Sequence, residues 1–435
     1  MERVAMNYKV IAGILILLSI ITIAVVMSQS ENRTDISKID PPDSQEKESP
    51  VEVLPPPDPA EEVLASLSLE EKIGQLFILG FQESMDSDSL RSLIEEKKMG
   101  GFILFQRNYR NIDTLIQLNQ QLHAWNKDNP VPLLISIDEE GGTVSRLPSG
   151  ATKFPEARLL GNINEENLTF QVGEVIGKEL SALGINLNFA PVMDVVSSKN
   201  NRLLYPRSYS GNPETVSRHG MRFIQGLQQQ GVIGVPKHFP GHGDTQVDSH
   251  GGMPKIMVDR DTLLRRELVP FKASIEGGAE MIMAGHLAFP IIDEQSLPAT
   301  RSRILLQELL RKELGFNGII VTDDLEMKGY TDKNISIEEA ALQSFDAGID
   351  LFVICHTEDL QMRVYNSLKE KAADGTISED RLNASVLRII RLKQKYDLSH
   401  YMYEDPEKIK AKVGTEAHKK ILQEVRNRGK SSPGS

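Results

Sequence analysis

One segment of this 435-residue sequence, KHFPGHGDTQVDSH at 237–250, concentrates residue types that transfer protons. Its glycines and proline indicate a loop that can fold closely over a ligand. Asp248 and His250 are two residues apart, so in extended backbone their side chains lie on the same side. The carboxylate can then hold one imidazole nitrogen and leave the other to deliver a proton. The spacing therefore indicates an acid/base pair.

Histidine and aspartate are also metal ligands, so the same loop admits a metal site as an alternative. The possible ligands are His238, His242, Asp244, Asp248 and His250. The set lacks an HxxxH pair on one helix face, and no second cluster follows the first apolar run. Neither a P-loop nor a dinucleotide-binding glycine pattern is present. We therefore expect no metal and no cofactor, with a metal-dependent hydrolase as the rival hypothesis.

A second segment, TDDLEM at 322–327, places two aspartates at the end of an apolar run. Adjacent residues of a strand point to opposite sides. We expect Asp323 to face a site and Asp324 to turn toward the surrounding helices or to cap the next helix. A buried carboxylate at such a position can attack an anomeric carbon, because its charge also stabilises an oxocarbenium-like transition state.

Eight short apolar runs alternate with helical patterns along the chain. They lie at 76–81, 101–105, 133–138, 185–191, 232–239, 281–286, 318–324 and 349–356. Such continuous runs are typical of parallel strands covered on both faces. Several end in titratable groups, namely Asp138, Lys237, His238, His286, Asp323 and His356. Since the carboxyl ends of barrel strands meet on one face, we expect these groups to share a site.

The helical patterns have recognisable ends. Asn212 followed by Pro213 is typical of an N-cap, Ser68 and Ser336 begin capping boxes, and Gly348 ends a helix just before the eighth run. Eight such units in roughly 330 residues predict the α/β class and a (β/α)8 TIM-like barrel. A doubly wound open sheet is the alternative.

Composition divides the chain into four expected parts. Residues 1–28 contain an uncharged apolar run preceded by basic residues, which predicts a transmembrane anchor with the rest of the chain on the extracytoplasmic side. A cleaved signal peptide followed by secretion is the alternative. Residues 29–60 are a Ser/Glu/Pro-rich linker. The catalytic barrel is expected at 61–400 and a C-terminal extension at 401–435.

Charge and cysteine content exclude some functions. The net charge is −12, which argues against a nucleic-acid partner. A single cysteine cannot form a disulfide framework or a cysteine-rich zinc site. Because Cys355 lies within an apolar run, we expect a buried small hydrophobic residue.

Several motifs in order resemble family 3 glycoside hydrolases, most closely the bacterial β-N-acetylglucosaminidases of that family. In addition to the two segments above they are SLEEKIGQLF (68–77), IDEEGGTVSRL (137–147), FAPVMDV (189–195) and YPRSYSG (205–211). The similarity covers about residues 63–398. The histidine-rich loop is highly specific, whereas TDD alone would be weak.

The resemblance implies a retaining glycosidase that releases terminal, non-reducing β-linked N-acetylglucosamine. It assigns Asp323 as the nucleophile and His250, oriented by Asp248, as the acid/base. It also implies that the sugar is held by Asp138, Arg146, Arg207, Lys237 and His238, with His286 lining the site. Export suggests cell-wall peptidoglycan fragments as the carbohydrate substrate. Thr143 and Glu139 depart from the pattern of many relatives, which leaves the outer subsite open.

Other functions remain open from the sequence. A β-glucosidase of the same family is one. An N-acetylglucosamine phosphorylase is another, because a neutral imidazole repels phosphate less than a carboxylate does. A non-catalytic surface sugar-binding protein is the third. Many larger relatives carry a second α/β domain after the barrel, and residues 418–429 resemble its start. We expect activity without that domain.

Overall fold

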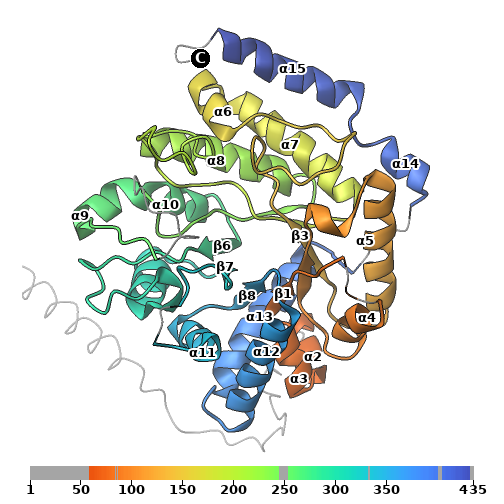
Figure 1. Ribbon diagram of the computed structural model, residues 1–435, viewed down its shortest axis with the longest axis vertical. Coiled ribbons are helices and arrows are strands. Elements are labelled where there is room, and N and C mark those ends of the chain that lie inside the picture. The colour runs from red at the N-terminus through yellow and green to blue at the C-terminus, as the bar shows by residue number, and fades with distance from the viewer. Residues whose placement is uncertain are drawn as a thin grey trace, which may run out of the picture. The chain divides into compact units, whose positions relative to one another are not determined.

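The computed structural model describes residues 58–83, 85, 87–243, 253–331, 334–399 and 404–431 (Figure 1). Asp248 and His250 lie outside these residues, as does the expected anchor at 1–28. Within the described part of the chain, no helix combines the length and the apolar character that a membrane span needs. The anchor therefore stays a prediction.

Eight parallel strands form the centre of the fold, each inside one of the predicted apolar runs. They are β1 (Phe77–Leu79), β2 (Gly101–Ile103), β3 (Leu134–Ile137), β4 (Leu187–Asn188), β5 (Ile233–Gly234), β6 (Met281–Ala284), β7 (Ile319–Asp324) and β8 (Leu351–Ile354). Their order is β5-β4-β3-β2-β1-β8-β7-β6, so consecutive strands pair, β1 also pairs with β8, and β5 and β6 stand at the two ends. This order defines a barrel.

The barrel closes through the segment that follows the short strand β5. The Phe239 N–H donates to the Met283 carbonyl at 2.8 Å, and the Gly285 N–H donates to the Phe239 carbonyl at 2.9 Å. These bonds join the continuation of β5 to β6. The predicted (β/α)8 architecture is therefore confirmed as a nearly closed TIM-like barrel, and the doubly wound open sheet is wrong.

Helices surround the strands (Figure 1). They are α2 (Pro59–Ser66), α3 (Leu69–Gly74), α4 (Ser87–Glu95), α5 (Ile112–Asn126), α6 (Ala157–Ile163), α7 (Glu166–Ala182), α8 (Pro213–Gln228), α9 (Arg260–Thr262), α10 (Val269–Glu276), α11 (Ile337–Ala347), α12 (Glu358–Ala373), α13 (Glu379–Lys395), α14 (Pro406–Lys410) and α15 (Glu416–Lys430). Two segments have π-helical hydrogen bonding, η2 (Leu263–Glu267) and η4 (Ile304–Glu313), and two are 3-10 turns, η1 (Gln106–Asn108) and η3 (Ala299–Arg301).

The predicted helix ends are where the sequence places them. The Asn212 side chain accepts from the Thr215 N–H at the start of α8, and Ser336 accepts from the Glu339 N–H at the start of α11. Ser68 forms the full reciprocal capping box with Glu71. Gly348 ends α11 with φ 123°, a conformation that favours glycine.

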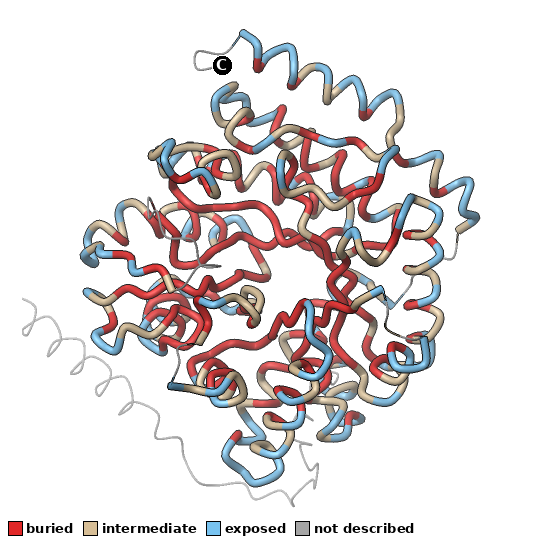
Figure 2. The backbone as a smooth tube through the Cα atoms, viewed as in Figure 1, coloured by how far each residue is buried: buried red, intermediate tan, exposed pale blue. Residues whose placement is uncertain are grey.

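The hydrophobic core fills the barrel and the layer between strands and helices. Figure 2 shows buried residues concentrated along the strands and on the inward sides of the helices. Large aromatic side chains such as Phe77, Phe102 and Phe352 are fully buried there. This packing holds the strand ends rigidly, so that short polar side chains following the strands keep fixed positions.

The described part of the C-terminal extension is ordered against the barrel. Helix α15 packs on α6 and α7 (Figure 1). The buried carboxylate of Glu179 in α7 joins them, because it contacts His418 Nδ1 at 2.7 Å and accepts the Gly414 N–H at 2.9 Å. It also accepts from the hydroxyl and the N–H of Thr152.

Candidate active site

A cavity of about 720 Å³ lies at the carboxyl ends of the strands. This volume lies within the range of small-molecule sites in proteins. Seven predicted site residues line it, namely Asp138, Arg146, Arg207, Lys237, His238, His286 and Asp323. Residues that are far apart in sequence thus meet on one face of the barrel, as expected from the strand ends.

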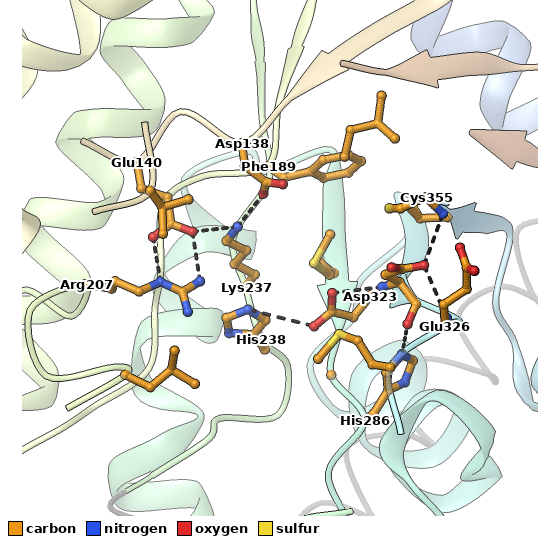
Figure 3. A pocket seen from close by; sticks show the side chains of 18 of the residues that line it. Asp138, Glu140, Phe189, Arg207, Lys237, His238, His286, Asp323, Glu326 and Cys355 are labelled. Atoms are coloured by element: carbon orange, nitrogen blue, oxygen red, sulfur yellow. Dashed lines mark hydrogen bonds and ion pairs between the residues drawn. The ribbon is translucent and has the colours of Figure 1, made fainter. Parts of the chain in front are cut away.

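Asp323 lies at the end of β7 and faces this cavity (Figure 3). Its Oδ2 is 4.0 Å from His238 Nε2, and its Oδ1 accepts the Asp324 N–H at 2.8 Å. Burial opposes ionisation of Asp323, but electrostatic interactions with His238 and His286 outweigh it and lower the pKa of the carboxyl. The group is therefore ionised at neutral pH, as a carboxylate nucleophile must be.

An irregularity in the sheet sets the different orientations of the two aspartates. Val321 pairs with Leu351 but Asp324 pairs with Val353, so β7 contains one extra residue, as in a β-bulge. Asp324 turns toward β8, where its Oδ1 accepts the Cys355 N–H at 3.1 Å. The expectation that the two side chains diverge holds, but Asp324 does not cap α11, because Ser336 does.

His238 is held by a carboxylate that the sequence analysis did not identify. The His238 Nδ1 donates to Asp194 Oδ2 at 2.7 Å. Asp194 Oδ1 also accepts the N–H groups of His238 and His242. Burial of Asp194 opposes its charge, yet His238 contributes most to lowering its pKa. The available sequence signal was its place in the motif FAPVMDV, three residues after the end of the predicted apolar run 185–191.

A second missed residue, Glu140, joins the cationic side chains of the cavity (Figure 3). Its two oxygens accept from Arg207 Nε and Nη2, both at 2.8 Å. Lys237 Nζ lies 2.7 Å from Glu140 and 2.8 Å from Asp138. Burial raises the pKa of Glu140, but Arg207 and Lys237 overcome this effect and hold the pKa well below its usual value. The ion pairs among Asp138, Glu140, Arg207 and Lys237 thus form one connected network.

The neighbouring residue Glu139 does not lie in the outer subsite, which the sequence analysis had left open for it. It is buried beneath the loop that carries Arg146, and its Oε2 accepts the N–H groups of Arg146 and Leu147. It does not line the cavity. Burial raises its pKa to about 7. Its departure from the family pattern therefore concerns the position of the Arg146 loop rather than a direct sugar contact.

His286 supports the end of β7 from below. Its Nε2–H donates to the Asp324 carbonyl at 2.9 Å, and its Nδ1 lies 3.0 Å from the Thr300 hydroxyl. Burial lowers its pKa, so the ring is neutral at neutral pH. The side chain lines the cavity, and its two bonds fix the backbone that carries Asp323.

The outer wall of the cavity carries an aromatic ring and cations. Phe105 lies beside His356, with ring centroids 5.4 Å apart. The Arg107 guanidinium carbon is 4.2 Å from the centre of the Phe105 ring, and that of Arg146 is 6.0 Å from it. A ring and cations of this kind can contact the face of a sugar. Phe105 and Arg107 were not among the predicted site residues.

The expected acid/base pair, Asp248 and His250, lies outside the described residues. Of the loop 237–250, the structure describes the part up to Gly243. His238 and His242 both line the cavity, with ring centroids 6.4 Å apart. The assignment of the pair therefore stays a prediction.

The site is of the glycosidase type and lies on a TIM-like barrel. It consists of an ionised carboxylate beside a histidine, in a cavity rich in groups that bind hydroxyls. Comparison with known proteins agrees, because residues 68–392 match the glycosyl hydrolase family 3 N-terminal domain. The chain belongs to glycosyl hydrolase family 3.

Individual relatives specify the branch. Beta-hexosaminidase A of Pseudoalteromonas piscicida is 36% identical over 329 residues, which are 70% of this chain and 55% of that protein. The beta-hexosaminidase of Neisseria gonorrhoeae is 37% identical over 288 residues, which are 63% of this chain and 78% of that protein. The solved structure of a family 3 beta-N-acetylglucosaminidase from Paenibacillus sp. FPU-7 is similar with a TM-score of 0.79 at 37% identity. The similar region covers 84% of this chain and 69% of that protein. The expected resemblance and enzyme class are confirmed, and this chain spans about half the length of the first relative.

Proposed function

We propose that this protein is a retaining β-N-acetylhexosaminidase that hydrolyses terminal, non-reducing β-linked N-acetylglucosamine. The observation that carries the proposal is the position of the Asp323 carboxylate, which faces a cavity of about 720 Å³ and lies 4.0 Å from His238. Relatives named beta-hexosaminidase support the choice of sugar. The proposal concerns the whole protein, beyond the family that the barrel defines.

The proposed reaction has two displacements. Asp323 attacks the anomeric carbon while the bond to the leaving oxygen breaks, and His250 gives that oxygen its proton. Water then attacks the glycosyl ester, His250 takes the proton, and Asp323 leaves as a carboxylate. Asp248 holds His250 in this scheme. Stereochemistry at the anomeric carbon is retained because it inverts twice.

Sugar binding follows from the charged network. Asp138 and Glu140 accept hydrogen bonds from hydroxyls, whereas Lys237 and Arg207 donate them. These four groups are already paired with one another before a sugar enters. Such preorganisation reduces the cost of orienting them at the moment of reaction. We assign Arg146 and His238 to the same role, and His286 to the lining of the site.

The natural substrate and location complete the proposal. We place residues 61–400 outside the cytoplasm, held at the membrane by 1–28 through the linker 29–60. Cell-wall peptidoglycan fragments that end in N-acetylglucosamine are the substrates that such a location offers. The support is the apolar run and the charge before it.

The mechanism can be tested by trapping the covalent intermediate with a 2-fluoro sugar, because the 2-deoxy-2-fluoro glycosyl-enzyme turns over very slowly. Peptide mapping then locates the labelled residue. We expect the label on Asp323. A label on Asp324, only one residue away, would contradict the orientation that we assign. A mass shift without any labelled carboxyl would contradict the covalent intermediate.

Substrate comparisons separate the remaining functions. We expect an aryl N-acetylglucosaminide to be cleaved much faster than the aryl glucoside, and a β-glucosidase would show the reverse. Release of sugar 1-phosphate that depends on added phosphate would indicate a phosphorylase instead. A non-catalytic sugar-binding protein would bind sugar with no rate for Asp323→Ala to remove. Loss of activity with chelators would favour the metal-dependent hydrolase.

A further inference from the structure

Three side chains with metal-binding atoms meet on the wall of the cavity between β7 and β8, and the proposed hydrolysis uses none of them. They are Asp324, Cys355 and His356, and one donor atom of each lies within 4.8 Å of the other two. All three line the same cavity as Asp323. Figure 3 shows Cys355 and Glu326 beside the end of the strand that carries Asp323.

The hydrogen bonds of Asp324 leave one of its oxygens available. Its Oδ1 accepts the N–H groups of Cys355 and Glu326, at 3.1 and 3.2 Å. Its Oδ2 lies 3.5 Å from His356 Nε2. The backbone thus fixes the carboxylate with its second oxygen toward the imidazole. Cys355 and His356 follow the end of β8, and the chain bends there, so that one donor atom of each lies within 4.8 Å of the Asp324 carboxylate.

Accessibility differs across the cluster in a way that suits an ion arriving from solvent. The His356 side chain is 47% exposed, whereas Cys355 is 4% exposed. An ion can therefore meet the imidazole first and the thiol behind it. Soft thiolate together with imidazole and carboxylate is a donor set that zinc prefers, usually with water in a fourth position.

The surrounding charges favour a cation. Asp323 and Glu326 add two carboxylates near Asp324, and both contribute to its electrostatic environment. A cation near the cluster, Arg107, donates to the carbonyls of Phe81 and Cys355. Its guanidinium donates to these backbone oxygens rather than to the carboxylate or the thiol of the cluster.

We propose that Asp324, Cys355 and His356 bind a thiophilic divalent cation, of which Zn²⁺ is the best match, and that the bound ion inhibits hydrolysis. Zinc binds donor atoms at about 2.0–2.3 Å, so the donor atoms themselves must lie roughly 3.3–3.7 Å from one another. Side-chain movements of about 1 Å bring the three donors to these distances. The thiol proton passes to solvent as the sulfur binds the ion. The added positive charge beside Asp323 weakens the nucleophile, which explains the inhibition.

The single cysteine of the chain makes a sharp test possible. The full protein in metal-free buffer is titrated with Co²⁺ and the thiolate-to-metal charge-transfer absorption is recorded. Any such band must come from Cys355. We expect one saturating band that added Zn²⁺ removes. Calorimetry then gives the Zn²⁺ affinity without sugar, so the outcome does not depend on the proposed hydrolase activity.

Variants assign the ligands. Cys355→Ser should abolish the band, and both Cys355→Ser and His356→Asn should weaken Zn²⁺ binding by at least about tenfold. Glu358→Gln is the control, because it removes a charge from an exposed residue close to the cluster without removing a ligand. It should bind Zn²⁺ like the parent. If Cys355→Ser fails to fold, the Zn²⁺ affinity of His356→Asn tests the site, because His356 is exposed.

Two results would overturn the proposal. One is the absence of a thiolate band in the parent protein. The other is Zn²⁺ binding whose affinity is the same in Cys355→Ser and His356→Asn as in the parent, because the ion would then occupy other residues. For the functional part, Zn²⁺ should slow hydrolysis of the aryl N-acetylglucosaminide in the parent and much less in Cys355→Ser. Equal slowing in both would remove the inhibitory role.

Discussion

At the scale of single residues, adjacent aspartates have opposite electrostatic environments. The histidines near Asp323 lower its pKa in spite of burial. Burial, with the charges of Glu326 and Asp323, raises the pKa of Asp324 to about 7. Carboxyl groups whose pKa values are pushed apart in this way take different roles in enzymes. The difference comes from the charges around each group, because His238 and His286 act on Asp323 whereas the carboxylates of Glu326 and Asp323 act on Asp324.

Asp194 is a positioning residue whose removal should change the pH profile. In Asp194→Asn the His238 ring loses the carboxylate that orients it beside Asp323, so it lowers the pKa of Asp323 less. The acid limb of kcat/KM should move to higher pH, with activity at its optimum reduced about 10- to 100-fold. A pH–rate profile measures this. Loss of activity with an unmoved acid limb would mean that Asp194 has a purely structural role.

The charge of Glu140 should make stability depend on acid. Its folded pKa lies below the ordinary value of 4.5, so the unfolded chain binds more protons, and stability falls as pH drops below that value. Glu140→Gln should cost roughly 3–5 kcal/mol at pH 7, because it removes the carboxylate that pairs with Arg207 and leaves Lys237 with Asp138 alone. Urea unfolding at several pH values measures both. The variant should lose less stability than the parent between pH 5 and pH 3, and an equal loss would contradict the assignment.

At the scale of elements, a buried carboxylate joins the C-terminal extension to the barrel. Glu179 accepts hydrogen bonds from Thr152 and Gly414 and contacts His418 at 2.7 Å. The contact links α7 to the start of α15, so it holds the extension against the barrel. Because the carboxylate is almost fully buried, it cannot replace a lost partner with bulk water.

His418→Ala should therefore destabilise the protein by about 1–3 kcal/mol. The neighbouring Lys419 is the control, since its ion pair with Glu416 is exposed and Lys419→Ala should cost less than about 1 kcal/mol. Urea unfolding measures both variants. Equal effects would show that the Glu179 contact does not hold α15.

At the scale of the whole molecule, the proposed anchor and the barrel should be separable. The site lies within the barrel, so removing residues 1–28 should leave the rate on an aryl N-acetylglucosaminide unchanged within about twofold. The truncated protein should move from the membrane fraction to the soluble fraction. Cell fractionation with an activity assay measures both. A parent protein already in the soluble fraction would favour the cleaved signal peptide.

Much of the architecture could be predicted because its causes are local. Apolar runs bounded by polar ends, the N-cap at Asn212 and the C-cap at Gly348 each follow from short-range chemistry. The rule that barrel strands present their carboxyl ends together then placed Asp138, Lys237, His286 and Asp323 in one cavity. These inferences did not require knowing which side chains contact one another in the folded protein.

The sequence by itself determined the eight strands, their helices and the residues that the barrel mouth must collect, since periodicity and caps act within a few residues. Tertiary structure alone decided that Asp194 holds His238, that Glu140 rather than Glu139 faces the cavity, and that Asp324 meets Cys355 and His356. Those pairings join residues some 30 to 70 positions apart or depend on a bulge in β7. Their physical cause is the packing of strands against one another, which no local pattern encodes.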